Sequence, residues 1–162
     1  MQIHKECFPK SSWKLFHALT HFGASHSAIL AGGTALALQL GHRISVDLDF
    51  FTTQVVDHER ALSTLRNKIS RLEVASESEG TLIGFADGVK FSLFHYEYPF
   101  VSPLIPFEGT NLAGIPDIAA MKIIAVCQRG VKRDFVDLYA ILQNMPFHKI
   151  APCMVSRFGS TA

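Results

Sequence analysis

The sequence predicts an α+β domain in which a short mixed β-sheet is packed with helices and is followed by a helical C-terminal part. Three observations favour this class: a glycine turn between a short strand and a short helix, an alternating strand with two aspartates, and amphipathic helices near the C-terminus. The 162 residues are enough for one domain with its own core. We expect residues 1–115 to form the core and residues 116–162 a short helical C-terminal part of the same compact unit.

The first elements are a helix, a strand and a second, shorter helix. Over residues 12–22, apolar side chains recur at helical spacing behind a serine that can serve as the N-cap. The apolar run of residues 28–31 stops at Gly32 and Gly33, and residues 34–40 are rich in alanine and leucine. This order predicts a strand, a glycine turn and a short helix.

An alternating strand and a surface helix come next. Residues 46–51 alternate polar and apolar side chains with a β-branched and aromatic bias, which predicts a strand with Asp47 and Asp49 on one face. Residues 57–72 carry apolar side chains at helical spacing with charges between them, and this pattern predicts a surface helix.

A hairpin is predicted in the middle of the chain. Residues 82–86 and 89–96 are strand-like runs on either side of the turn signal Asp87-Gly88. Four prolines interrupt the segment that follows, which predicts irregular structure up to residue 116.

Two helices are predicted after the proline-rich segment. Asp117 can cap a helix that runs to about Arg129. Residues 132–143 form the final predicted helix, because apolar side chains recur along one face of it. The tail after Met145 has no clear pattern.

The composition excludes several classes of protein. Hydrophobic residues make up 48% and charged residues 18%, which excludes an extended disordered chain. Fifteen basic and fourteen acidic residues leave a net charge of +1, so no bulk field indicates a nucleic-acid coat or an anionic membrane partner. No apolar run is long enough for a membrane span, and the N-terminus lacks the apolar core of a signal peptide. We expect a cytoplasmic protein with no membrane partner.

Asp47 and Asp49 are the candidate metal ligands. Carboxylates at positions i and i+2 of a strand point the same way and lie close enough to share or bridge hard divalent cations. Two like charges among apolar neighbours are costly unless a metal or cationic side chains neutralise them. The alternative interpretation is a strand face that is simply solvated.

The glycine turn adds a second signal. Gly32, Gly33 and Thr34 lie at a strand-to-helix junction, where free backbone N–H groups bind phosphate oxygens well. The turn is neither a P-loop, because no Gly-Lys-Ser/Thr follows, nor a Gly-x-Gly-x-x-Gly fingerprint. Beside a metal-binding strand, it predicts a site for a nucleotide polyphosphate.

These motifs carry a family resemblance. Residues 32–51, Gly-Gly-Thr-Ala-Leu-Ala-Leu-Gln-Leu-Gly-His-Arg-Ile-Ser-Val-Asp-Leu-Asp-Phe-Phe, resemble the signature of the AbiEii/AbiGii toxin family. Residues 119–122 with Arg129, and then residues 132–138, are similar to the family's later lysine and Asp-x-x-Asp motifs. The family is similar to nucleotidyltransferases of the DNA polymerase β superfamily, so the resemblance implies an α+β nucleotidyltransferase fold.

The resemblance also implies an activity. This is a two-metal transfer of a nucleoside monophosphate from a nucleoside triphosphate to an acceptor, with two Mg²⁺ ions at Asp47 and Asp49. The acceptor would be RNA, tRNA among the candidates, or a protein, and a cognate antitoxin is an expected partner. The implied nucleotide-binding residues are Gly32, Gly33, Thr34, Arg43, Ser45, Lys122 and Arg129.

Several of these roles have open alternatives. Arg43 either pairs with Asp47 or Asp49 in the empty site or holds a substrate phosphate. Lys122 and Arg129 either neutralise phosphate charge or lie on a solvated helix edge. A further pair of carboxylates, Asp134 and Asp137, shares one helix face at positions i and i+3. These two residues either form a structural ion pair, with Arg129 or Arg133, or position the acceptor.

One departure from the resembled pattern concerns a third carboxylate. Polymerase β-like enzymes usually carry one on a neighbouring strand, and here Ser92 stands at the expected place. Either Asp87, Glu97 or Asp134 replaces this carboxylate, or the site works without it, or catalysis is weak.

Three candidate functions follow from these motifs: an active nucleotidyltransferase toxin, a catalytically weakened nucleotide-binding or regulatory protein, and an interaction module that keeps only the fold.

Overall fold

The computed structural model describes residues 2–25 and 27–159, and over these residues the chain forms an α+β fold with one mixed sheet. The sheet order is β3-β4-β5-β2-β1-β7-β6. The strands are β1 Ile29–Ala31, β2 Leu48–Thr52, β3 Leu72–Ser78, β4 Thr81–Ala86, β5 Val89–His95, β6 Ile105–Phe107 and β7 Thr110–Leu112. The helices are α1 Trp13–Ser25, α2 Gly32–Leu40, α3 His58–Arg66, α4 Ile115–Gln128, α5 Lys132–Asn144 and α6 Phe147–Phe158, after the 3₁₀ turns η1 Lys5–Cys7 and η2 Lys10–Ser12.

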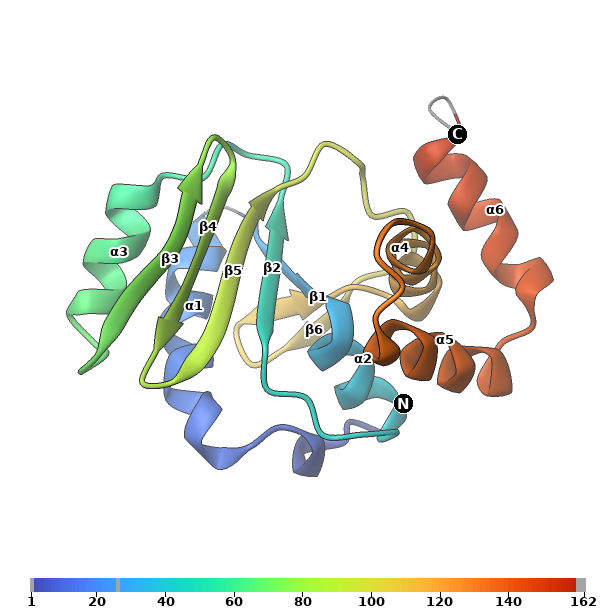
Figure 1. Cartoon of the computed structure of the whole chain (residues 1–162), viewed down its shortest axis with the longest axis horizontal. Coiled ribbons are helices and arrows are strands. Elements are labelled where there is room, and N and C mark those ends of the chain that lie inside the picture. Colours follow the sequence, from blue (N-terminus) through green and yellow to red (C-terminus); the bar gives the residue numbers. More distant parts are fainter. Residues whose placement is uncertain (1, 26, 160–162) are drawn as a thin grey trace.

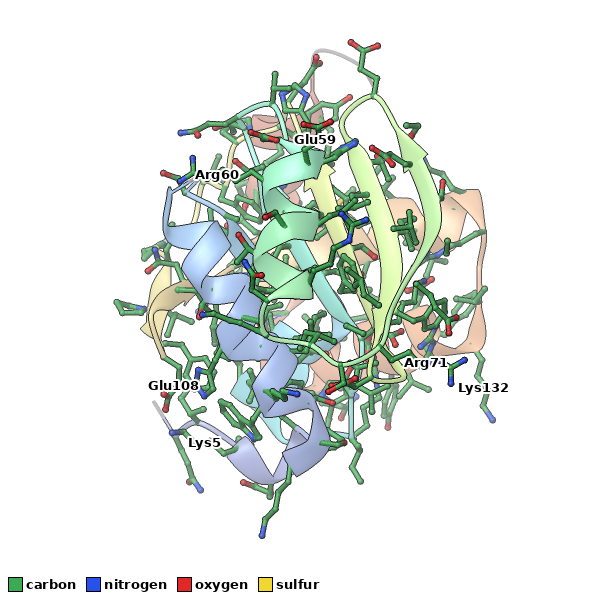
Figure 2. The ribbon with its side chains drawn as sticks, turned by 90° about the vertical axis from the view of Figure 1, so that its left-hand side faces the viewer. Lys5, Glu59, Arg60, Arg71, Glu108 and Lys132 are labelled. Carbon is green, nitrogen blue, oxygen red and sulfur yellow. The ribbon has the colours of Figure 1, made fainter. Side chains whose placement is uncertain are left out.

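The two faces of the sheet have different partners. On one face of the sheet, Leu48 and Phe50 of β2 are buried in the same core as apolar residues of α1 and α3. These two helices lie side by side over that face (Figures 1 and 2). Side chains alternate along a strand, so Asp49 and Phe51 lie on the opposite face. There α4, α5 and α6 are gathered at one side of the molecule (Figure 1), and the site described below is on this face.

The centre of the sheet brings the sequence motifs together. Strand β2 is antiparallel to β1, with Ala31 opposite Asp49, and parallel to β5, with Asp49 opposite Ser92. The chain leaves β1 directly into the glycine turn, so this turn starts beside Asp49. The predicted strand, glycine turn and short helix are confirmed, and α2 ends at Gly41 in the left-handed conformation.

The hairpin prediction is confirmed, and a second hairpin was missed. Asp87 and Gly88 both have positive φ, as a type I′ turn between β4 and β5 requires. The proline-rich segment is not wholly irregular, because β6 and β7 form a hairpin within it. Pro106 is tolerated in β6 because this strand is at the edge of the sheet.

Two predicted boundaries were wrong. Strand β2 begins at Leu48 rather than Val46, so Asp47 precedes the strand. The helix predicted over residues 57–72 ends at Arg66, and Leu72 begins β3. Strand β3 is an exposed edge strand with many polar residues, and it therefore lacks the alternating pattern that identifies a half-buried strand.

The C-terminal part also differs from the prediction. Asp117 does not cap α4; its buried carboxylate accepts hydrogen bonds from the backbone N–H groups of Val101 and Ser102. Helix α5 is not the last helix, because α6 follows it, with Pro152 inside the helix obscuring its pattern. The expected division between residues 115 and 116 falls at the start of α4 and stays a prediction.

Candidate active site

A cavity of about 610 Å³ opens between the β2 and β5 face of the sheet and the helices α4 and α5. The glycine turn, both candidate carboxylates and several cationic side chains line it. The cationic residues are Arg43, Lys90, Lys122, Arg129 and Arg133. The cavity therefore combines, in one space, groups that suit metal ions and groups that suit phosphates.

Asp49 lies on the floor of this cavity. A Cβ atom on Gly32 would be 3.0 Å from its Oδ2 atom, so the glycine turn is in direct contact with the carboxylate. Burial raises the pKa of Asp49, a hydrogen bond from Ser92 opposes this, and the charge of Asp47 adds to it. Among the described residues, no ion pair neutralises Asp49. The ionised carboxylate is thus short of positive charge.

Asp47 lies just before β2 and faces the same cavity. Its carboxylate forms an ion pair with the exposed guanidinium of Arg133, at 2.9 Å. Its backbone carbonyl accepts a hydrogen bond from the hydroxyl of Thr34. The backbone around Asp47 is therefore fixed to α2, while among the described residues its side chain is held by the surface cation Arg133 alone.

The glycine turn also contacts the loop that leads to β2. A Cβ atom on Gly33 would lie 2.3 Å from Nη2 of Arg43, so only glycine permits this approach. Thr34 is buried, and its hydroxyl is 2.9 Å from that of Ser45. Gly32, Gly33, Arg43 and Ser45 line the cavity, whereas Thr34 does not, and its hydroxyl is occupied within the protein.

Arg43 does not pair with Asp47 or Asp49, which corrects one of the two expected roles. Its Nε and Nη2 atoms donate instead to the two carboxylate oxygens of Asp137, at 2.6 and 2.9 Å. His42 is 2.8 Å from the same carboxylate. The loop before β2 is therefore tied to α5, and the predicted substrate contact of Arg43 requires this bidentate pair to open or the outer edge of the guanidinium to serve.

Lys122 joins the two aspartates of α5. Its ammonium is 2.9 Å from Asp134 and 2.7 Å from Asp137, and its side chain is almost completely buried. Burial alone would raise the pKa of Asp137, but hydrogen bonds from His42, Arg43 and Lys122 hold that pKa far below its usual range. The solvated-edge interpretation of Lys122 is wrong, since the residue belongs to a buried ion-pair network.

Arg129 completes this network. Its guanidinium donates to Asp134 at 2.9 and 3.2 Å. Burial would raise the pKa of Asp134, but the hydrogen bonds from Arg129 and Lys122 lower it overall. Arg129 is itself exposed and lines the cavity, so its outer edge is accessible to a ligand.

The structure locates the candidates for a third acid. Ser92 is directly opposite Asp49 and buried in the cavity wall, where the third carboxylate was expected. Asp87 is in the hairpin turn, paired with Lys14, and neither it nor Glu97 lines this cavity. Asp134 does line it, but two cations already neutralise its charge.

Sequence reasoning missed an aromatic wall at one end of the cavity. The rings of Phe51 and Phe94 stack at 5.0 Å, and those of Tyr98 and Phe158 approach to 4.9 Å. Tyr96 lies between these pairs. Alternation along β5 was a usable signal for Phe94, but Phe158 comes from the unrecognised helix α6.

The carboxylate pair fits hard divalent cations by its chemistry. Asp47 and Asp49 offer oxygen donors that lack sufficient positive partners. Within the described residues, no group of three or more His, Cys, Asp or Glu side chains is arranged to hold a metal. An ion at this pair therefore needs further oxygen ligands from water or substrate phosphates.

The fold is shared with known nucleotidyltransferases. The Megavirus polyadenylate synthase superposes with a TM-score of 0.63 at 14% identity, covering 84% of this chain and 32% of that one. The antibiotic-resistance factor ANT(2'')-Ia gives a TM-score of 0.65 at 11% identity, with 93% and 91% coverage. At these identities the likeness establishes the fold, and the predicted nucleotidyltransferase fold is confirmed.

The sequence gives the family. An uncharacterized protein of Aquifex aeolicus (strain VF5) is 38% identical over 140 residues, which cover 83% of this chain and 67% of the relative. The family model described as nucleotidyl transferase AbiEii toxin, type IV toxin–antitoxin system, matches residues 13–160. The chain belongs to this family and is a nucleotidyltransferase, whose reaction class is the transfer of a nucleoside monophosphate. In the described part of the chain, no helix is both long and apolar enough to cross a membrane.

Proposed function

We propose that the protein transfers a nucleoside monophosphate from a nucleoside triphosphate to an RNA or protein acceptor, with two Mg²⁺ ions at Asp47 and Asp49. One observation carries the proposal: a single cavity is lined by the glycine turn, the two carboxylates and a rim of cations. Carboxylates alone would repel a triphosphate. Carboxylates that hold metal ions, together with basic side chains, form a site that attracts a triphosphate.

The chain's own groups suggest how a triphosphate lies in the cavity. Backbone N–H groups at the start of α2, next to Gly32 and Gly33, suit phosphate oxygens. Arg129 and Lys90 add positive charge at the rim. The nucleobase would lie toward the aromatic wall, where Tyr96 offers a ring surface.

The proposed reaction is an in-line displacement. The acceptor oxygen forms a bond to the α-phosphorus, the bond from that phosphorus to the bridging oxygen breaks, and pyrophosphate leaves with the electron pair. Bound Mg²⁺ supplies stabilisation of the negative charge that develops on these oxygens. The hydroxyl proton passes to water, because Ser92 is not a base at neutral pH.

The family's toxin–antitoxin context suggests the biological setting. We propose that the protein acts in the cytoplasm on RNA, with tRNA among the candidates, or on a protein, and that a cognate antitoxin counteracts it. Incubation with each α-labelled nucleoside triphosphate, Mg²⁺ and total RNA or lysate tests this. Label that becomes sensitive to ribonuclease or to protease identifies the acceptor class. The proposal is contradicted if the unchanged protein transfers no more label to RNA or to protein than the Asp49→Asn variant does.

A second candidate function is a catalytically weakened nucleotide-binding or regulatory protein. The observation that favours it is the serine opposite Asp49, at the place of the third carboxylate. Ser92→Asp separates the two candidates. If the missing acid limits catalysis, the new carboxylate should raise the transfer rate. If the enzyme is already complete, a third negative charge should repel those of Asp47 and Asp49 and lower the rate or leave it unchanged.

A further inference from the structure

A second cavity adjoins the first at Asp47. It has a volume of about 490 Å³ and is lined by residues of η2, of the loop before β2 and of the β4–β5 hairpin turn. This turn is at the lower end of the sheet in Figure 1. Asp47, Lys90 and Arg133 line both cavities, whereas Gly32 and Gly33 line only the first. The two cavities therefore meet at one of the proposed metal ligands.

The sheet orders the side chains along this face. On β5, Phe94, Ser92 and Lys90 follow one another at two-residue steps of about 6.6 Å. Phe94 stacks on Phe51, Ser92 is opposite Asp49, and Lys90 is opposite Phe85 of β4. One aromatic surface thus lies on each side of the carboxylates: the stacked pair in the first cavity and Phe85 in the second.

In-line transfer gives the two cavities different roles. The attacking oxygen and the leaving pyrophosphate lie on opposite sides of the reacting phosphorus. A triphosphate bound at the glycine turn occupies the first cavity. An acceptor hydroxyl that comes from the opposite side must then enter past Asp47, and the second cavity opens there.

We propose that the second cavity is the acceptor subsite and that it takes the terminal nucleotide of a single-stranded nucleic acid. This inference rests on the proposed function of the first cavity. Phe85 is 40% exposed in the cavity wall, and a free aromatic ring is a platform on which a nucleobase stacks. Lys90 and Arg133 stand at the junction with the first cavity, where the phosphate of that nucleotide would lie.

The charge around the cavity fits a polyanion. Every exposed charged residue between positions 118 and 159 is basic, and these residues are Arg129, Lys132, Arg133 and Lys149. Lys132 projects from the surface (Figure 2) next to Arg133 at the start of α5. Among the described residues that line the second cavity, Asp87 is the one acidic residue besides Asp47, and it already pairs with Lys14. A strand leaving the cavity over α5 would meet positive charge only.

The test measures acceptor and nucleotide binding separately. The probe is a fluorescein-labelled single-stranded oligoribonucleotide of about six nucleotides, within the range of one small binding surface. Its affinity is measured by anisotropy with Mg²⁺ present, and the affinity for each nucleoside triphosphate is measured in parallel. The variants are Phe85→Ala, Phe85→Trp and Ser11→Trp, the last because exposed Ser11 lines the second cavity and a large ring there fills it. Phe147→Ala is the matched control, since Phe147 is exposed and lines neither cavity.

We expect Phe85→Ala and Ser11→Trp to weaken oligonucleotide binding by roughly tenfold, with Phe85→Trp equal to or tighter than the unchanged protein. Phe147→Ala should bind normally, and nucleoside triphosphate affinity should be the same in all four variants. Unchanged oligonucleotide binding in Phe85→Ala and Ser11→Trp would overturn the inference, as would transfer of label to protein that excess oligonucleotide does not inhibit. Failure of the proposed function has a different signature, which is the absence of triphosphate binding with oligonucleotide binding still sensitive to Phe85.

Discussion

Two pairs of aspartates lie close to the same cavity, and their electrostatic surroundings are opposite. Asp134 and Asp137 on α5 are buried and contact four cationic or ring-nitrogen partners, which hold both pKa values low. Asp47 and Asp49 have Ser92 and one exposed arginine, and burial raises the pKa of Asp49. The first pair is satisfied within the protein, and the second requires positive charge from outside.

The contrast teaches how to tell a structural carboxylate pair from a functional one. Spacing does not separate them, because i, i+2 on a strand and i, i+3 on a helix both place two carboxylates on one face. The number of cationic side chains that contact each pair does distinguish the two kinds. A neutralised pair costs stability when it is broken, whereas an under-neutralised pair costs stability as it stands.

The largest expected effect is on catalysis through the under-neutralised pair. Asp49→Asn removes the charge that a hard cation needs, and we expect transfer activity to fall by about 10³-fold or more. The same change should raise the free energy of unfolding, because it removes a buried charge. Label transfer and urea denaturation of Asp49→Asn and Asp47→Asn check both statements. An active Asp49→Asn enzyme would remove Asp49 from the site.

The second effect is on stability through the neutralised pair. Asp137→Asn leaves Lys122, Arg43 and His42 without their shared carboxylate, and we expect a loss of about 3–5 kcal/mol in the free energy of unfolding. Glu73→Gln, in an exposed pair with Arg71, is the control and should change it by less than about 1 kcal/mol. Equal effects of the two substitutions in urea denaturation would mean that the network is not structural.

A third effect connects the glycine turn with the neutralised pair. Gly33→Ala places a Cβ atom 2.3 Å from Nη2 of Arg43, so the guanidinium must shift and its hydrogen bonds to Asp137 are strained. We expect triphosphate affinity to fall roughly tenfold and stability to fall as well. A double-mutant cycle with Arg43→Ala measures the coupling. Strictly additive effects would show that Gly33 acts through the phosphate alone.

The acid response should distinguish the pairs again. The folded chain lowers the pKa of Asp137, so its contribution to stability is present above its unfolded pKa of about 4 and is lost as the pH falls. The pKa of Asp49 is raised, so its contribution is present at low pH and is lost as the pH rises. Denaturation of both asparagine variants across this range should show that Asp137→Asn flattens the acid loss and Asp49→Asn does not.

The smallest expected effect is at Arg133. The Arg133 side chain is largely exposed in its pair with Asp47, so Arg133→Ala should change the free energy of unfolding by less than about 1 kcal/mol. Because the guanidinium occupies a carboxylate oxygen that a metal ion would use, we expect Mg²⁺ affinity to rise slightly. Isothermal titration with Mg²⁺ measures this, and a large loss of stability would show that Asp47 depends on Arg133.

Part of the fold and site could be read from local patterns. Strand alternation, the Asp87-Gly88 turn signal and the Gly32-Gly33 junction each depend on residues that are neighbours in the chain. Edge strand β3 could not be predicted from a local pattern because it is polar and exposed, and helix α6 could not because it contains Pro152. The aromatic wall was missed with α6, since Phe158 reaches the cavity only from that helix.

The sequence by itself determined the family, the glycine turn and the aspartate strand, because these signals are contained within about twenty consecutive residues. Only the tertiary structure decided which cation neutralises which carboxylate. Arg43 meets Asp137 across 94 positions, and Arg133 meets Asp47 across 86. Such pairings depend on how α5 packs against the loop before β2, and no local period or propensity encodes the contact between two side chains that folding alone brings together.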